Sequence, residues 1–252
     1  MRWFTLIFVI ALTSLLTLTS LEAEELIDNL VLAFSFEEGA GETIKDLSGQ
    51  GNNGIINGNA KWVEGPLGKA LYFDGVTYVV APHIAFDNRS FTVQLWVKPE
   101  TTVDEVVFSQ YELNSDNMSL HFRIKGDSGI LMGFYSNDLE APAGFLKNNE
   151  WYNLTFWFDE SDKTRKIYVD GQEVATDVSA TAYLGTKGDI WIGGWERPTK
   201  AEHPFYQIYH GAVDEVRVWH RLLDEDEIID SINTEMSVDP QEKLTTTWGK
   251  LK

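Results

Sequence analysis

The chain has 252 residues, with 39 acidic and 20 basic side chains and a formal net charge of -19 at pH 7. Repulsion from phosphate groups argues against nucleic acid and anionic membranes as partners. The absence of cysteine excludes disulfide bonds and thiolate metal sites. The fold must therefore be held by its hydrophobic core, with a metal bound through other ligands as a further possible contribution.

Residues 1–23 have the pattern of a secretory signal peptide. A short basic start precedes an almost continuous apolar and hydroxyl run from Trp3 to Leu18, and TSLEA at 19–23 is a small-residue cleavage site. The alternative is an uncleaved membrane anchor, although the run is at the short end for a spanning helix. We expect a secreted, periplasmic or cell-surface protein that does not contact the membrane once the signal is removed.

From Leu30 onward the sequence is typical of β-strands joined by turns. Short runs rich in Val, Ile, Phe, Tyr, Trp and Thr are separated by Gly, Asn, Asp and Pro. Asp74-Gly75 and Asp170-Gly171 each separate two such runs and predict hairpin turns. The expected strands are 30–36, 70–73, 78–81, 90–98, 106–109, 120–124, 130–135, 151–158, 166–169, 173–176, 190–193 and 212–219.

These runs predict an all-β fold of two packed antiparallel sheets, a β-sandwich, over residues 24–233. One short helix is expected near the end of this domain, where Asp224 is a candidate N-cap and Glu227 follows three residues later. Acids in a first helical turn are expected from the helix dipole alone, so we assign them no catalytic role. Residues 234–252 are polar and lack periodicity, which predicts a C-terminal tail.

Seven segments, in order, resemble the laminin-G-like jelly roll of the concanavalin A-like lectin and glucanase superfamily. They are FSFEEGAGETIKDLSGQGNNGII, GPLGKALYFDGVTYVVAP, SFTVQLWVKPE, EWYNLTFWFD, KIYVDGQEV, DIWIGG and YHGAVDEVRVWHRLLDEDEI. The resemblance implies a jelly-roll β-sandwich from about Leu30 to Asn233. That superfamily includes glycan-binding modules, adhesion domains and a few enzyme lineages, so the resemblance is more specific for fold than for function.

No catalytic arrangement is evident in the sequence. Gly-x-Ser-x-Gly and His-Glu-x-x-His are both absent. A retaining glycosidase needs two carboxylates about 5 Å apart, and the Glu-x-Asp-x-Glu type strand of the superfamily's glucanases is missing. Asp214 and Glu215 are adjacent and are expected to point to opposite faces of a strand. We therefore expect a non-catalytic protein, with a glycoside hydrolase or lyase as the more distant alternative.

A calcium site is one of two interpretations of the turn-rich stretch DLSGQGNNGII at 46–56. Alternation in AVDEVRVW at 212–219 places Asp214 on the apolar face, where a buried carboxylate needs a partner. The resemblance places the first and last strands side by side, which would bring the Asp46 loop toward Asp214. Either the N–H groups of the loop bond to Asp214, or calcium lies between Asp46, Asn52, Asn53 and Asp214.

Two loops mix aromatic and polar side chains in the way that sugar sites do. The 194–211 loop contains Trp195, Arg197, His203 and Tyr206, and the 111–117 stretch contains Tyr111 and Asn114. Local packing is the alternative role for Trp195 and Tyr206. We expect an exported carbohydrate-binding or adhesion module whose partner is a glycan or an extracellular protein. A protein-interaction or surface-structural domain without sugar affinity is the first alternative.

Overall fold

The computed structural model describes residues 26–101, 103–196, 205–206 and 208–236. The expected signal peptide at 1–23 and most of the expected tail, 237–252, lie outside these residues. In the described part of the chain, no helix has the length and apolar character needed to cross a bilayer. The expected domain boundaries stay predictions.

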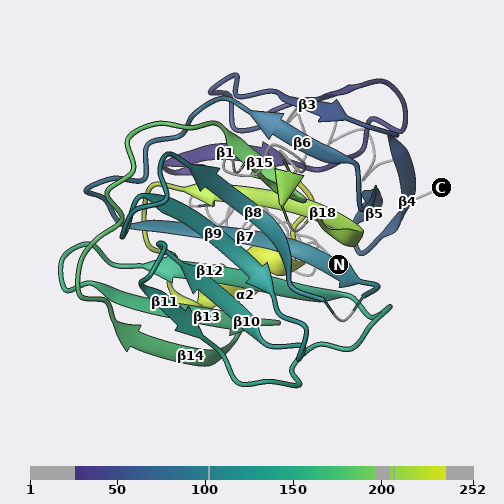
Figure 1. Cartoon of the computed structure of the whole chain (residues 1–252). Coiled ribbons are helices and arrows are strands. Elements are labelled where there is room, and N and C mark those ends of the chain that lie inside the picture. Colours follow the sequence, from purple (N-terminus) through teal and green to yellow (C-terminus); the bar gives the residue numbers. More distant parts are fainter. Residues whose placement is uncertain (1–25, 102, 197–204, 207, 237–252) are drawn as a thin grey trace, which may run out of the picture.

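Two eight-stranded antiparallel sheets form the body of the molecule, one lying over the other (Figure 1). The first sheet has the order β14 (Gln172–Val178), β13 (Thr164–Val169), β12 (Tyr152–Phe158), β7 (Phe91–Pro99), β18 (His210–Trp219), β5 (Gly68–Asp74) and β4 (Lys61–Gly65), and β1 (Leu30–Phe34) also pairs with β18. The second has the order β11 (Asp138–Glu140), β10 (Ile130–Gly133), β9 (Ser119–Ile124), β8 (Glu105–Tyr111), β15 (Ile190–Ile192), β6 (Tyr78–Ala81), β3 (Gly54–Asn57) and β2 (Thr43–Ile44). A separate pair joins β16 (Trp195–Glu196) to β17 (Phe205–Tyr206).

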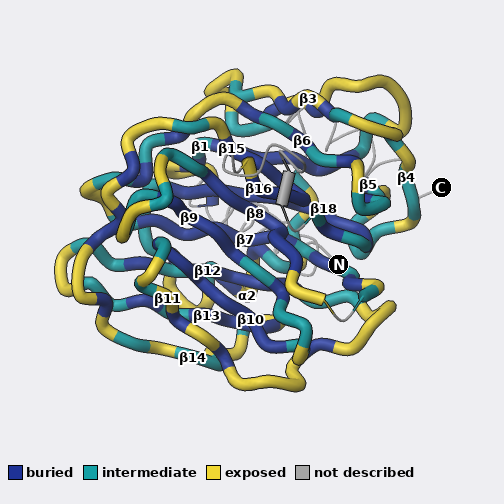
Figure 2. The backbone as a smooth tube through the Cα atoms, in the orientation of Figure 1, coloured by how far each residue is buried: buried dark blue, intermediate teal, exposed yellow. Residues whose placement is uncertain are grey.

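Most strand residues of both sheets are buried or partly buried (Figure 2). Apolar side chains from both inner faces fill the space between the sheets. Phe122 of β9 and Phe156 of β12 stack across it, with ring centroids 4.1 Å apart. Full burial of such a side chain contributes about 1.5–3 kcal/mol. The core explains how a chain without cysteine is stabilised, and the all-β sandwich prediction is confirmed.

The two Asp-Gly pairs have different structures, although the sequence predicts a hairpin at both. Asp170 (φ 50°) and Gly171 (φ 77°) turn β13 into its partner β14, as predicted. The prediction for Asp74-Gly75 is wrong, because β5 and β6 belong to different sheets. The Asp74 carboxylate accepts hydrogen bonds from the amide (2.9 Å) and hydroxyl (2.8 Å) of Thr77, which shapes a crossing between sheets instead.

The predicted helix is confirmed as α2 (Glu225–Asn233), which packs on the outer face of the first sheet. Asp224 accepts a hydrogen bond from the amide of Glu227 (2.9 Å), and the Glu227 carboxylate accepts one from the amide of Asp224 (2.9 Å). This reciprocal capping box satisfies two amides that the helix itself cannot pair. Ile228 then buries its side chain in a cluster that includes Trp219.

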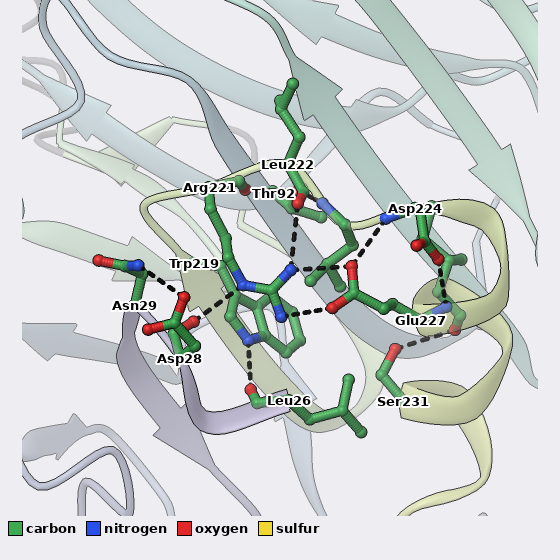
Figure 3. A network of polar contacts seen from close by, with 12 residues as sticks. Leu26, Asp28, Asn29, Thr92, Trp219, Arg221, Leu222, Asp224, Glu227 and Ser231 are labelled. Carbon is green, nitrogen blue, oxygen red and sulfur yellow. Dashed lines mark hydrogen bonds and ion pairs between the residues drawn. The ribbon is translucent and has the colours of Figure 1, made fainter. Parts of the chain in front are cut away.

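Side chains from the end of β18 join the helix to the start of the described chain (Figure 3). The Trp219 indole donates to the carbonyl of Leu26 (2.7 Å), and Arg221 donates to the carbonyl of Asp28 (3.0 Å). Arg221 also pairs with the Glu227 carboxylate at 2.7 Å. Two of the acids at the start of α2, Asp224 and Glu227, therefore have structural partners.

Candidate functional site

A β-bulge interrupts β18 and moves two acids to one side of the sheet. Val213 pairs with the core residue Val97, and the register shifts between Asp214 and Arg217. Asp214 pairs with Trp96 on the outer face, so its predicted place on the apolar face is wrong. Glu215 has a left-handed conformation (φ 48°) and is the extra residue of the bulge. The bulge breaks the strict alternation of inward and outward side chains that the prediction assumed.

The Glu215 side chain also lies on the outer face, because it pairs with Arg217, which in turn donates to the carbonyl of Ser231 in α2 (2.5 Å). The expectation that Asp214 and Glu215 point to opposite faces is therefore wrong. Both are fully buried, with exposed fractions of 0% and 2%, so neither carboxylate lines an open groove in the described part of the chain. This pair gives no support to the hydrolase alternative.

The carboxylate of Asp214 is buried but accepts few hydrogen bonds. Its oxygens accept from the amide of Glu215 (2.8 Å) and, at 3.5 Å, from the amide of Leu67 in the turn between β4 and β5. Burial, together with the neighbouring Glu215 charge, raises the pKa of Asp214 to about 8. Burial also raises the pKa of Glu215, which the Arg217 charge opposes. Asp214 is therefore largely protonated at neutral pH.

Asp46 has the opposite environment, because its own loop surrounds the carboxylate with donors. One oxygen accepts from the amides of Ala33 and Ser48, both at 3.0 Å. The other accepts from the Ser48 hydroxyl and the Asn52 amide, both at 2.8 Å. The bond from Ala33 joins this loop to β1, so the Gly- and Asn-rich stretch forms a hydrogen-bonded clasp of loop to strand.

The residues of the calcium hypothesis do not fit a shared cation site. Each oxygen of Asp46 already accepts from two donors, and the amide oxygen of Asn53 accepts from the Asp46 amide (2.9 Å). The Asn52 side-chain amide donates to the carbonyl of Val31 (2.9 Å). The other interpretation, in which N–H groups of the loop bond to Asp214, is wrong, because Asp214 accepts from Leu67 and Glu215. No group of three metal-ligating His, Asp or Glu occurs among the described residues. The calcium hypothesis is a question for experiment.

The clearest candidate site is an aromatic cluster on the second sheet, which we call the aromatic rim: Tyr111, His121, Tyr135 and Trp195. The Trp195 ring stacks on His121 of β9, with centroids 4.7 Å apart and an interplanar angle of 16°. Tyr111, at the end of β8, and Tyr135 meet the same indole edge-on, at 6.2 and 6.5 Å. Three aromatic rings from three other segments therefore contact the Trp195 indole.

The rim unites part of the predicted ligand set. Tyr111 and Trp195 are brought together, Asn114 lies in the turn that follows Tyr111, and the backbone of Tyr206 pairs with that of Trp195. Arg197, His203 and the side chain of Tyr206 lie outside what the structure describes. Trp195 is only 2% exposed and packs within the cluster, whereas Tyr111 and Tyr135 are partly exposed residues.

His121 and Tyr135 were not among the predicted site residues. Tyr135 (φ 70°) and Ser136 (φ 55°) are consecutive left-handed residues in the turn between β10 and β11. Asn and Gly normally occupy such a turn, so the Tyr-Ser pair does not predict a turn from the sequence. A bulky residue such as Tyr135 is strained in the left-handed conformation. The turn is fixed by hydrogen bonds from the Asn117 amide to the carbonyl of Tyr135 (3.1 Å) and from the Asn137 side chain to that of Asn117 (2.6 Å). Strain of this kind is most often kept at functional sites.

Comparison with known proteins identifies the family. A family model described as the concanavalin A-like lectin/glucanases superfamily matches residues 73–229. The chain belongs to this superfamily. No curated protein sequence matches it.

Solved structures with this fold include several binding domains. The binding domain of Paraclostridial Mosquitocidal Protein 1 is 16% identical with a TM-score of 0.63, covering 82% of this chain and 52% of that one, so the chain spans about half of that domain's length. Domain 4 of the GH43 extracellular arabinanase AbnA from Geobacillus stearothermophilus, in complex with arabinotriose, is 22% identical with a TM-score of 0.62, covering 81% of this chain and 98% of that one. The binding domain of botulinum neurotoxin DC in complex with SialylT is 14% identical with a TM-score of 0.62, covering 82% of this chain and 52% of that one.

Proposed function

We propose that this protein is an exported, non-catalytic module that binds a glycan at the aromatic rim. The observation that carries the proposal is the pair of partly exposed tyrosines, Tyr111 and Tyr135, whose rings contact the buried Trp195–His121 stack. The arabinanase domain whose structure contains arabinotriose, and the toxin binding domains, support a binding role for a sandwich of this kind. Export rests on the signal pattern in residues 1–23.

The rim has the chemistry that a sugar ring requires. A pyranose or furanose ring has an apolar C–H face, which packs on aromatic rings, and a rim of hydroxyl groups, which need amide or hydroxyl partners. Tyr111 and Tyr135 can supply the first, while Asn114 and Ser136 lie in the same two turns and can supply the second. Because neighbouring hydrogen bonds fix the backbone of both turns, little backbone freedom is lost on binding.

A panel of immobilised polysaccharides that includes arabinan tests the proposal, with each column run in calcium and in chelator. We expect retention on one polysaccharide class, and loss of that retention in Tyr135→Ala and Tyr111→Ala. The matched control is Tyr152→Ala, which removes a partly exposed tyrosine from the first sheet. Thermal unfolding of each variant confirms that it is folded.

The outcomes separate the proposed function from its alternative. Retention that neither rim variant changes would remove the rim from consideration. No retention on any polysaccharide in either buffer would favour the protein-interaction or surface-structural domain, and binding would then be sought among extracellular proteins.

A further inference from the structure

His121 of the aromatic rim and Asp138 of β11 meet over a glycine. In the second sheet β9, β10 and β11 are neighbours (Figure 1), and Gly133 of β10 pairs with His121 on one side and with Asp138 on the other. A side chain at Gly133 would come within 2.3 Å of the His121 Nε2 atom and 2.7 Å of an Asp138 oxygen. Because glycine has no side chain, these two atoms approach each other to 3.8 Å. Ser109 of β8 lies opposite His121 on the other side, so neither neighbouring strand places a charged residue opposite this ring.

The two ring nitrogens of His121 face different acceptors. Nδ1 lies 3.2 Å from the carbonyl of Ser119, which can only accept, so Nδ1 carries a hydrogen. Nε2 faces the Asp138 carboxylate and is therefore the nitrogen that gains or loses a proton. With that proton the ring is an imidazolium paired with a carboxylate. Without it, a nitrogen lone pair and a carboxylate oxygen face each other.

The charge of Asp138 depends on His121 for its balance. In the described part of the chain, the ion pair of Asp138 is with His121. Burial raises the pKa of Asp138 above its ordinary 3.8, the charges of Arg123 and Arg165 oppose this effect, and that of Glu140 adds to it. Each of these three neighbours has an ion-pair partner of its own: Arg123 with Asp104 (2.9 Å), Arg165 with Asp177 (2.6 Å) and Glu140 with Lys125 (2.6 Å).

The stack on Trp195 couples His121 to the rest of the rim. The exposed fractions are 3% for His121 and 2% for Trp195, so a movement of either closely packed ring displaces the other. Trp195 in turn contacts the rings of Tyr111 and Tyr135. An imidazolium lying parallel to an indole, with centroids 4.7 Å apart, gains a cation–π attraction that the neutral ring lacks. The proton on His121 therefore strengthens the contact on which both tyrosines lie.

We propose that His121 and Asp138 form a proton switch that sets the arrangement of the aromatic rim. Above the pH at which Asp138 becomes charged, and below the pH at which His121 loses its proton, the ion pair and the stack hold Trp195 in place. At higher pH the His121 ring turns away from the carboxylate, and the rim loosens. The proposal rests on the proposed function only for its consequence, that glycan binding weakens as pH rises, because the switch itself needs no ligand.

Nuclear magnetic resonance of the purified chain between pH 5 and pH 9 tests the switch without a ligand. The signals followed are the ring Cε1–H of His121 and the indole N–H of Trp195, and we expect both to change with one common midpoint. In Asp138→Asn the midpoint should fall by about one pH unit, because the imidazolium loses its opposite charge. The matched control is Glu140→Gln, in the same strand, which should shift the midpoint less because Glu140 pairs with Lys125.

The two signals are identified by their absence from the spectra of His121→Gln and Trp195→Phe, or by through-bond assignment of the labelled wild type if either variant does not fold. Thermal unfolding at pH 6 confirms that Asp138→Asn and Glu140→Gln are folded. Separate midpoints for His121 and Trp195, or a His121 signal that does not titrate in this range, would overturn the switch. An unchanged midpoint in Asp138→Asn would also overturn it, since the carboxylate would then have no hold on the proton.

The polysaccharide columns, arabinan included, run at pH 6 and pH 8.5, test the consequence for binding. We expect several-fold weaker retention at pH 8.5 in the wild type, and no such difference between the two pH values in His121→Gln. Equal wild-type retention at both pH values, together with a common midpoint in the spectra, would overturn control of binding by the switch. No retention on any column at either pH would contradict the proposed function, while a common midpoint would still support the switch.

Discussion

Asp46 and Asp214 are both buried aspartates, but their surroundings differ in how many donors they supply. Asp46 lies in a loop whose amides and hydroxyl converge on it, so its two oxygens accept four hydrogen bonds. Asp214 lies in a bulged strand, and its carboxylate accepts from the amides of Glu215 and Leu67. A loop can arrange its backbone around one carboxylate, whereas a bulged strand cannot.

The comparison separates two energetic roles for the same residue type. A carboxylate that accepts several amide hydrogens stabilises the fold in its charged form. A carboxylate buried beside a second acid stabilises the fold only while it is protonated, as the raised pKa of Asp214 indicates. The next three experiments test this difference.

The largest effect is expected from Asp46→Ala. The change removes the acceptor for four donors and releases the 46–54 loop from β1, so we expect a loss of about 3 kcal/mol in the free energy of unfolding. Urea unfolding measures it, with Asp116→Ala as the control because Asp116 is exposed. A loss below about 1 kcal/mol would mean that the loop hydrogen bonds are replaced by water at little cost.

A pH-dependent effect of comparable size is expected from Asp214→Asn. The pKa of Asp214 is raised in the folded state to about 8, from an ordinary value of 3.8. The stability linked to its proton is therefore fully present below about pH 4 and is lost as pH rises through about 8. The amide cannot ionise, so relative to the wild type the variant should gain about 2–4 kcal/mol between pH 5 and pH 9.

Urea unfolding of the wild type and Asp214→Asn at pH 5, 7 and 9 provides this measurement. Asp46→Asn, measured at the same pH values, provides the comparison between the two environments. Parallel pH profiles for the wild type and Asp214→Asn would show that Asp214 is already charged at neutral pH.

The smallest effect is expected from calcium. If calcium joined the Asp46 loop to Asp214, a concentration one hundred times its dissociation constant would stabilise the fold by about 2.7 kcal/mol. The hydrogen bonds that occupy both Asp46 oxygens lead us to expect no difference in unfolding midpoint between calcium and chelator. A midpoint that rises with calcium, and no longer rises in Asp46→Ala, would restore the calcium hypothesis.

Much of the fold could be predicted from local patterns. Alternation identified strands such as β7 and β12, and the spacing of Asp224 and Glu227 identified the start of α2, since both signals depend on residues a few positions apart. The same local signal failed at Asp74-Gly75. A hairpin and a crossing between sheets begin with the same turn, and only the later pairing of the strands distinguishes them.

The candidate site was predicted in part, for a similar reason. Tyr111, Asn114 and Trp195 lie in loops that mix aromatic and polar residues, which is visible in the sequence. Tyr135 lies in a turn without the usual turn residues, and His121 lies in the middle of a strand. Their places beside Trp195 depend on which strands are neighbours, and no local pattern specifies this.

The sequence by itself therefore determined the class of fold, the helix cap and the residue types available for binding, because each depends on short-range geometry and on burial of apolar surface. Only the tertiary structure decided which face Asp214 occupies, which donors satisfy Asp46 and which rings meet at the rim. A single bulge at Glu215 reverses the alternation of β18, and pairing between distant strands brings β8, β9 and β16 together. These outcomes depend on the packing of the whole sandwich, which couples residues far apart in the chain.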